Sequence, residues 1–367
     1  MLFYIIPLVY TLYCAIVYDI NKSQYGKWHH WFVLFVYMTL FMGLRYCVGG
    51  DTVNYMVDFT WVPELENYTI ISANRYNPGF NLLMSIGKSI TADFVGFQLL
   101  HSFLLNLLLF YFIHQYSKCP FYVFFISLFV FYYYFSTEIL REAIAVLVFA
   151  LNYKNLVKRL WVRYYILVFI SVMFHTSALF LVVLPFLRWI KFNKAYLLIY
   201  MLTVIVGLNV KSILNVGTIQ IIFDGISNYI EEDTHGMLAD LLNLVRNALF
   251  PLSFALYVKY GTKKAGSLEF ENMIAIMVLL GTLSYFNPII FSRLCNYFIL
   301  FFVISFADCS IRMLKSHFVQ LRQWSIMFFI ITIFVYGSNF VMYNYYTRLV
   351  PYYSVFNPIK IDRDSFK

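Results

Sequence analysis

Residues 45–55 could carry out chemistry, because a guanidinium, two adjacent glycines and a carboxylate follow an apolar segment here. Gly49 and Gly50 allow a sharp backbone path, and Asp51 lies six residues after Arg45. An arginine with free backbone amides beside it favours the binding of a phosphate-bearing ligand. Residue types alone leave a second interpretation open, an exit turn in which Arg45 reaches the lipid headgroups and pairs with Asp51.

Other charged or titratable side chains interrupt apolar stretches further along the chain, namely Arg141, His175, Arg293 and Arg348. A charge near the bilayer centre costs about 2.5–3.5 kcal/mol, so such residues usually face a cavity or a partner. Guanidinium groups bind phosphate oxygens through paired hydrogen bonds, and an imidazole exchanges protons near neutral pH. These residue types predict a site for an anionic head group whose apolar tail lies in the bilayer.

Each of these residues also has a simpler interpretation when it is taken alone. Glu138 and Glu142 could pair locally with Arg141. Arg293 could be a helix-end charge that reaches the headgroups, and His175 could be a core histidine bonded to a carbonyl. The site is therefore predicted from the convergence of these residues on one leaflet.

The composition of the chain is that of a membrane protein. Of its 367 residues 62% are hydrophobic and 12% are charged, whereas soluble domains carry about a quarter charged residues. We predict an all-α polytopic integral membrane protein with a single transmembrane domain over residues 1–367. Residues 1–18 lack a basic start and a cleavage site, which indicates a retained first helix. The net charge of +9 comes largely from loop residues that set orientation, which argues against nucleic acid as a partner.

The apolar runs predict about 12 transmembrane helices, some of them short, broken or re-entrant, around an outer-leaflet cavity. The predicted extracytoplasmic loops are 45–94 and 209–235, and in the first of them Pro78 opens a short helix of about 13 residues that is interfacial or re-entrant. Residues 164–187 are predicted as two short helices broken at His175, because the basic loops on both sides should lie on one face. The remaining predicted spans are 2–18, 31–44, 95–114, 120–136, 138–153, 196–208, 236–258, 272–290, 293–309 and 325–343.

Four segments resemble, in the same order along the chain, the EpsG/Wzy family of bacterial polysaccharide (O-antigen and exopolysaccharide) polymerases. The resemblance covers most of the chain, and the first and third segments are its stronger matches. The family usually has a small polar residue in place of Gly50 and a glutamine in place of Glu142. The segments are RYCVGGDTVNY at 45–55, LREAIA at 140–145, FHTSAL at 174–179 and SRLCNYF at 292–298.

The resemblance implies a glycosyltransferase in the bacterial inner membrane, with its active site facing the periplasm. Such an enzyme transfers a glycan from undecaprenyl diphosphate to the next lipid-linked repeat unit. The undecaprenyl-diphosphate-linked repeat units and the bilayer are then its partners, and neither a cofactor nor a metal ion is expected. Whether a chain-length regulator binds stays open.

The resemblance also implies roles for the residues in the matching segments. His175 is the predicted base for the acceptor hydroxyl, and Asp51 is the alternative base or a residue that orients an arginine. The arginines would stabilise the charge that develops on the diphosphate leaving group. The residues predicted to bind substrate are Arg45, Arg141, Arg293, Arg348, Tyr55 and Asn54.

Two other functions remain compatible with the sequence, a flippase for lipid-linked oligosaccharides and another polyprenyl-dependent glycosyltransferase. A flippase would tend to show internal repeats and full-length helices, and the sequence has no such repeat. The second alternative would typically carry an acidic pair in its first outer loop. This chain has Asp51 beside Arg45 instead, with Asp58 not far away.

Overall fold

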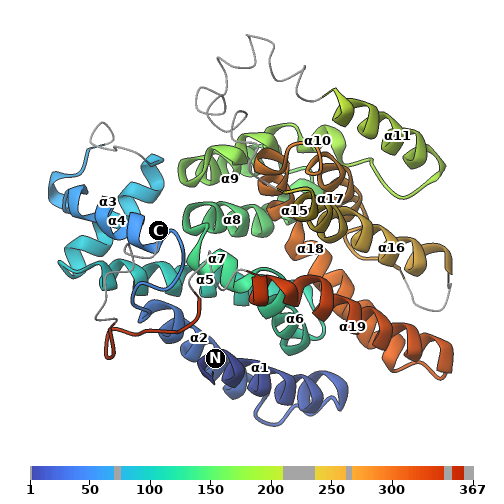
Figure 1. Ribbon diagram of the computed structural model, residues 1–367, viewed down its shortest axis with the longest axis horizontal. Helices are drawn as coiled ribbons and strands as arrows, with labels where there is room; N and C mark the ends of the chain where they lie inside the picture. Colours follow the sequence, from blue (N-terminus) through green and yellow to red (C-terminus); the bar gives the residue numbers. More distant parts are fainter. Residues whose placement is uncertain (1, 70–75, 210–235, 262–266, 343–348, 359–367) are drawn as a thin grey trace. The chain divides into compact units, whose positions relative to one another are not determined.

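The computed structural model of the protein describes residues 2–69, 76–209, 236–261, 267–342 and 349–358, and most of these residues are helical (Figure 1). No β-strand occurs in these ranges, and two isolated bridges pair short backbone segments. The predicted all-α class is therefore confirmed.

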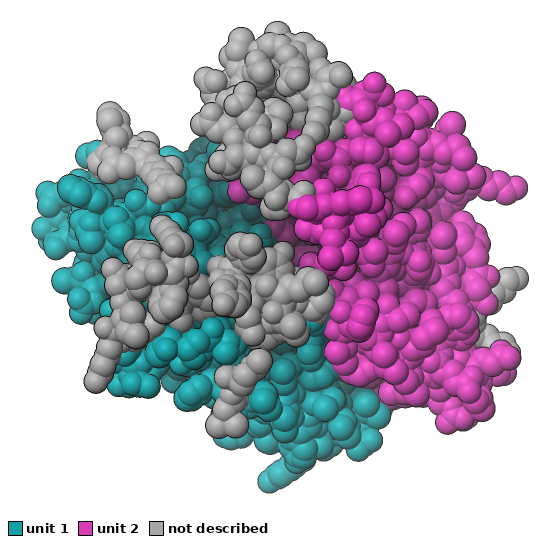
Figure 2. Space-filling model, in the orientation of Figure 1, with its two compact units in different colours: residues 1–182, 336–367 teal, residues 183–335 magenta. Residues whose placement is uncertain are grey.

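Two compact units make up the structure, and Figure 2 shows them in teal and magenta. Unit 1 comprises residues 1–182 and 336–367, and unit 2 comprises residues 183–335. The prediction that 1–367 form a single transmembrane domain stays a prediction. The residues discussed below for the candidate site belong mostly to unit 1.

In unit 1, two short helical turns extend the main helices. The first, η1 (Ala15–Ile20), prolongs α1 (Leu2–Cys14), and the second, η4 (Leu128–Tyr132), joins α6 (Pro120–Ser127) to α7 (Tyr133–Thr137). Helix α5 packs against α2, α4 and α8, so it lies at the centre of this part of the molecule. The main helices are α1 (Leu2–Cys14), α2 (Lys27–Gly43), α5 (Phe94–Tyr116), α6 (Pro120–Ser127), α7 (Tyr133–Thr137), α8 (Leu140–Val157) and α9 (Trp161–Phe174).

Unit 2 contains the remaining predicted spans, and its helices pack around α17 and α18. The side chain of Asn287 accepts a hydrogen bond from the N–H of Ile290 at 3.1 Å, which caps the start of α18. Its helices are α10 (Leu184–Leu187), α11 (Lys194–Leu208), α15 (Met237–Leu244), α16 (Phe250–Leu256), α17 (Glu271–Leu283), α18 (Pro288–Leu314) and α19 (Val319–Met342), of which the last continues into unit 1.

Among the described residues, six helical segments are long and apolar enough to cross a bilayer, which is consistent with a polytopic membrane protein. Three shorter apolar helices, α9, α11 and α17, coincide with further predicted spans. The predicted number of about 12 crossings and the outer-leaflet cavity stay predictions. The six segments are Phe3–Ile20, Phe94–Tyr116, Pro120–Thr137, Met237–Gly261, Pro288–Leu314 and Val319–Gly337.

The first predicted loop folds into two short helices that lie beside α5 (Figure 1). The predicted short helix that Pro78 opens is confirmed as α4 (Pro78–Ile90, 13 residues), whereas α3 (Thr52–Trp61) was not predicted. Lys88 on α4 donates hydrogen bonds to the carbonyls of Thr60 at 3.0 Å and Val62 at 2.6 Å. This lysine satisfies carbonyls at the C-terminal end of α3 and so ties the two helices together.

The chain breaks and turns back at His175, as predicted. Helix α9 ends at Phe174, and a 3-10 helix, η5 (Thr176–Val182), follows. The hydroxyl of Tyr164, near the start of α9, donates to the carbonyl of Leu181 at 2.6 Å, so the segment after the break runs back along α9. The returning segment is a 3-10 helix followed by the single turn of α10, and it is not the second α-helix that the sequence suggested.

Candidate functional site

Arg45 lies just after α2 and is buried, with 1% of its surface exposed. Its Nε donates to the carbonyl of Val48 at 3.3 Å, and its Nη1 donates to the carbonyl of Met42 in the last turn of α2. The guanidinium therefore holds the exit of the helix and does not reach the headgroups, so the exit-turn interpretation is wrong on this point. Its Nη2 is buried without a hydrogen-bond partner among the described residues.

Burial lowers the pKa of Arg45 to about 10, while the nearby Tyr352 and Glu138 raise it. A pKa of about 10 is still far above neutrality, so the guanidinium stays cationic at pH 7. Water screens a buried charge less than an exposed one, so its potential reaches further. Arg45 thus supplies a fixed positive potential to the turn that follows it.

The turn at residues 49–51 is held by a carboxylate from a distant segment. The N–H of Gly50 donates to Glu138 Oε1 at 2.7 Å, and the N–H of Asp51 donates to Oε2 at 3.3 Å. The prediction that these amides are free for a phosphate is therefore wrong. Glu138, between α7 and α8, occupies the position that an anion would take on such a pair of amides.

Gly49 is the residue that lets this turn approach Glu138. Its φ is +106°, and a Cβ added to it would lie 2.8 Å from the carbonyl oxygen of Thr137. We expect Gly49→Ala to lower the free energy of unfolding by about 2–5 kcal/mol, the sum of backbone strain and steric overlap. The measurement is the melting temperature of the detergent-solubilised protein. Gly236→Ala is the control, because a Cβ there meets nothing within 4 Å, and equal melting temperatures for the two variants would contradict the packing of this turn.

Arg141, in the first turn of α8, is oriented by two tyrosines of the first loop. Its Cζ lies 4.5 Å from the centroid of the Tyr76 ring, a cation–π contact, and the Tyr76 hydroxyl donates to Asp58. Arg141 also lies within hydrogen-bonding reach of the Tyr55 hydroxyl, whose pKa is raised by burial and lowered by this arginine. The guanidinium is half-buried, and its buried Nε has no hydrogen-bond partner among the described residues.

His175 follows α9 directly and is nearly buried. Its Nδ1 lies 2.6 Å from the hydroxyl oxygen of Ser177, and the N–H of Ser177 lies 3.3 Å from the same nitrogen. The backbone N–H of Ser177 donates to Nδ1, so Nδ1 is an acceptor and the neutral ring carries its proton on Nε2. Ser177 therefore orients the imidazole and leaves Nδ1 as its basic nitrogen.

The segments that carry Arg141 and His175 both contact one buried aromatic cluster of unit 1. Leu140, next to Arg141, belongs to the cluster, and Phe174, next to His175, packs against it. The side chain of Asn77 donates to the carbonyl of Val172 at 3.2 Å, which holds the start of α4 against the end of α9. The buried members of the cluster are Tyr55, Phe59, Val62, Tyr76, Phe80, Leu83, Met84, Phe94, Phe97 and Leu140.

Two buried polar residues of α5 fix the segments that carry the arginines. Gln98 donates to the carbonyl of Arg45 at 2.7 Å, and His101 Nε2 donates to the carbonyl of Leu140 at 2.9 Å. These residues are three positions apart and lie on the same side of the helix. Sequence reasoning missed them, although polar residues inside an apolar span were the signal that could have found them.

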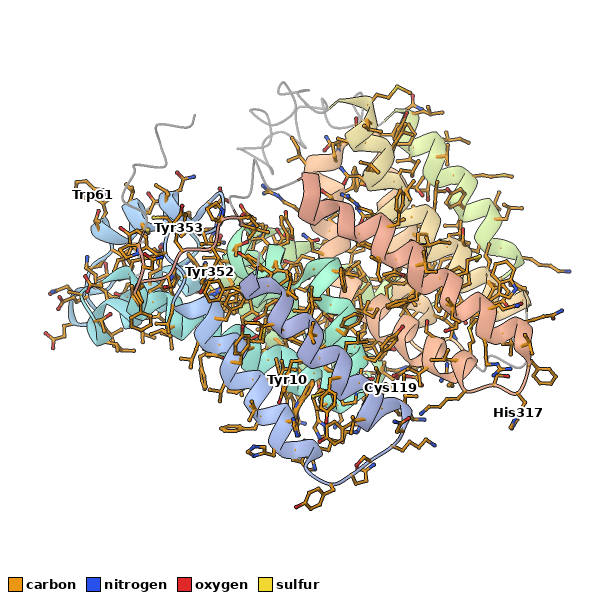
Figure 3. All side chains as sticks on the ribbon, turned by 60° about the horizontal axis from the view of Figure 1, so that its bottom comes forward. Tyr10, Trp61, Cys119, His317, Tyr352 and Tyr353 are labelled. Carbon is orange, nitrogen blue, oxygen red and sulfur yellow. The ribbon has the colours of Figure 1, made fainter. Side chains whose placement is uncertain are left out.

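A segment near the C-terminus closes over the Arg45 segment, and no feature of the sequence predicted this. The N–H of Tyr46 donates to the carbonyl of Tyr353 at 3.0 Å, and the N–H of Val355 donates to the carbonyl of Leu44 at 3.0 Å. The hydroxyl of Tyr352 donates to the carbonyl of Phe41 at 2.6 Å. Figure 3 shows Tyr352 and Tyr353 side by side near the end of α2. The burial of Arg45 is therefore completed by residues far away in the sequence.

The other predicted site residues lie elsewhere. Asp51 and Asn54 are exposed on the first turns of α3, near Tyr55 but outside the buried cluster. Arg293 belongs to unit 2, in the second turn of α18, and Arg348 lies outside the described residues. Within the described ranges, no group of three or more His, Cys, Asp or Glu side chains is arranged to hold a metal ion.

These features define a polytopic, all-helical membrane protein with a cationic, aromatic-lined site on one unit. A model of the EpsG family matches residues 28–354, and the chain belongs to this family of Wzy-like polysaccharide polymerases. The match includes the Arg45, Arg141 and His175 segments. No curated protein and no solved structure matches the chain.

Proposed function

We propose that this protein lengthens a polysaccharide by transferring a glycan from undecaprenyl diphosphate to a lipid-linked repeat unit, at the outer side of the bacterial inner membrane. Membership of the EpsG family supports a polymerase. The observation that carries the site is Arg141, a half-buried guanidinium with an unpaired donor beside the cluster that His175 adjoins.

Arg141 is the residue proposed to contact the diphosphate directly. Its cation–π contact with Tyr76 fixes the plane of the guanidinium, and the fork of N–H donors matches two phosphate oxygens. Arg45 acts differently from our first expectation of a direct contact, because it is buried and two of its nitrogens bond to carbonyls. It contributes positive potential near the leaving group. Arg293 and Arg348 are proposed as further diphosphate ligands.

The proposed reaction needs no group beyond these side chains and the two substrates. The acceptor hydroxyl oxygen forms a bond to the anomeric carbon of the glycan, and the bond between that carbon and the diphosphate oxygen breaks. Undecaprenyl diphosphate leaves with the electron pair, stabilised by the arginines. The hydroxyl proton goes to His175, whose ring Ser177 orients through Nδ1.

The exposed residues of α3 suit the sugar side of the substrate. Asn54 can donate and accept hydrogen bonds, and Asp51 is the alternative base or an acceptor for a sugar hydroxyl. The Tyr55 hydroxyl lies against Arg141, at the border between the proposed diphosphate and sugar positions. Sugars are recognised in this way by polar groups beside aromatic rings.

The experiment that tests the proposal is incubation of the purified protein with a defined lipid-linked repeat unit, followed by a gel that resolves chain length. We expect a ladder of products with one repeat unit per step, in the presence and in the absence of EDTA. Movement of the lipid-linked unit across the bilayer without a ladder would identify a flippase. A single transfer that requires Mg²⁺ or Mn²⁺ would identify another polyprenyl-dependent glycosyltransferase.

A further inference from the structure

Glu138 is a half-buried carboxylate that the proposed mechanism does not use. It accepts hydrogen bonds from two consecutive amides, those of Gly50 at 2.7 Å and Asp51 at 3.3 Å. Two N–H groups that point at one carboxylate make a specific contact, since both of its oxygens are bonded and each bond is charge-assisted. The contact joins segments 87 and 88 residues apart, so it is a tertiary link and no local helix cap.

This link connects the two arginine-bearing segments of unit 1. On one side it fixes the turn that follows Arg45 and precedes Tyr55. On the other side, Glu138 stands three residues before Arg141, whose own helix start is held by the bond between His101 and the carbonyl of Leu140. A shift of Glu138 would therefore move the turn and Arg141 relative to each other.

We propose that Glu138 is a positioning residue for the transfer reaction, and that its carboxylate sets the spacing between the Asp51 turn and Arg141. The inference rests on the proposed function. Glu138 bonds to the protein and leaves the diphosphate to Arg141, so its effect on the reaction is indirect. A misplacement of catalytic groups by about 1 Å is enough to slow an enzyme roughly 100-fold.

The ionisation of Glu138 supports the same role. Burial raises the pKa of Glu138 to about 7, and the charge of Asp51 raises it too, whereas the amides of Gly50 and Asp51 and the charge of Arg45 lower it. The charged or titratable groups that face it are Arg45, Asp51 and Tyr55. Protonation turns one acceptor oxygen into a donor, so one amide loses its bond. The hydrogen bonds between Glu138 and the turn should therefore weaken as the pH falls through about 7, and the rate of transfer should fall with them.

The test compares Glu138→Gln and Glu138→Asp with the wild type in two measurements. Hydrogen exchange of the peptide over residues 45–55 reports whether the amides of Gly50 and Asp51 are still protected. Single-turnover kinetics with the lipid-linked repeat unit separate the rate of transfer from the affinity for undecaprenyl diphosphate. The control is Glu66→Gln, a change at an exposed carboxylate that makes no side-chain hydrogen bond to any described residue.

We expect Glu138→Gln to exchange faster in this peptide alone and to transfer roughly 10- to 100-fold more slowly, since one charge-assisted hydrogen bond is lost. Its affinity for undecaprenyl diphosphate should stay within about threefold of the wild type, because the fork of Arg141 is retained. Unchanged exchange in the peptide, or transfer at the wild-type rate, would overturn the inference. If the wild-type protein forms no ladder, the proposed function is refuted. Hydrogen exchange of the peptide over residues 45–55 would then still test whether Glu138 protects the amides of Gly50 and Asp51.

Discussion

Arg141→Lys is expected to reduce the rate of chain lengthening by about 10- to 150-fold, because one charge-assisted hydrogen bond that acts in the transition state is worth about 1.5–3 kcal/mol. A lysine keeps the positive charge but presents a single ammonium group, so it cannot bond to two phosphate oxygens at once. It also loses the planar contact with the Tyr76 ring, whose centroid lies 4.5 Å from Cζ of the arginine. The measurement is the initial rate of ladder formation, made with protein whose melting temperature has been verified.

The control for this prediction is Arg163→Lys, because Arg163 is exposed on α9 and its side chain makes no hydrogen bond within the described part of the chain. Wild-type rates in both variants would make Arg141 a helix-end charge that lipid headgroups satisfy, since lysine serves that purpose equally well. Arg45→Lys is a less informative change. It removes hydrogen bonds to Val48 and Met42, so a loss of activity would be accompanied by a loss of stability.

His175→Ala is expected to slow the transfer by about 10²–10⁴-fold, the usual contribution of a general base. The affinity for undecaprenyl diphosphate should remain nearly intact, because the guanidinium of Arg141 is unchanged. Ser177→Ala should have a smaller effect of the same kind, since it removes only the group that orients the ring at 2.6 Å. Stopped single-turnover reactions at saturating donor give the rate of the chemical step for each variant.

His317→Ala provides the control, because His317 is exposed in the connection between α18 and α19 (Figure 3). Full activity of His175→Ala would assign the base to Asp51 or show that no side chain acts as one. If His175→Ala lowers both the rate of transfer and the affinity for the lipid diphosphate, His175 binds the substrate and does not take its proton.

The sequence predicted the parts of the fold that local patterns determine. The apolar runs located the long helices, Pro78 marked the start of α4, and the two basic loops around 164–187 indicated the break at His175. Helix α3 was missed because its buried residues, Thr52, Tyr55 and Phe59, form a short apolar face in a region of mixed polarity. Their spacing of three and four residues is that of a helix face and could have revealed it.

The sequence could not predict the contacts that join distant segments. The bond between Glu138 and the Gly50 amide spans 88 residues, and the contact of Tyr4 with the carbonyl of Leu349 spans 345. Such pairs have no signature in composition or periodicity, because either partner alone resembles an ordinary polar residue. For that reason the sequence indicated Arg45 and Arg141 as candidates but described the Gly50 and Asp51 amides wrongly as free.

The most direct test of the central claim is photochemical crosslinking with an undecaprenyl diphosphate analogue that carries a photoreactive group next to the diphosphate. The claim is that the lipid diphosphate binds beside Arg141, at the aromatic cluster between α3, α4, α8 and the end of α9. We predict crosslinked peptides that contain residues 51–58, 76–80, 138–142 or 174–178, with labelling reduced by unlabelled lipid diphosphate and by Arg141→Lys. Competable crosslinks confined to peptides outside these segments would contradict the account.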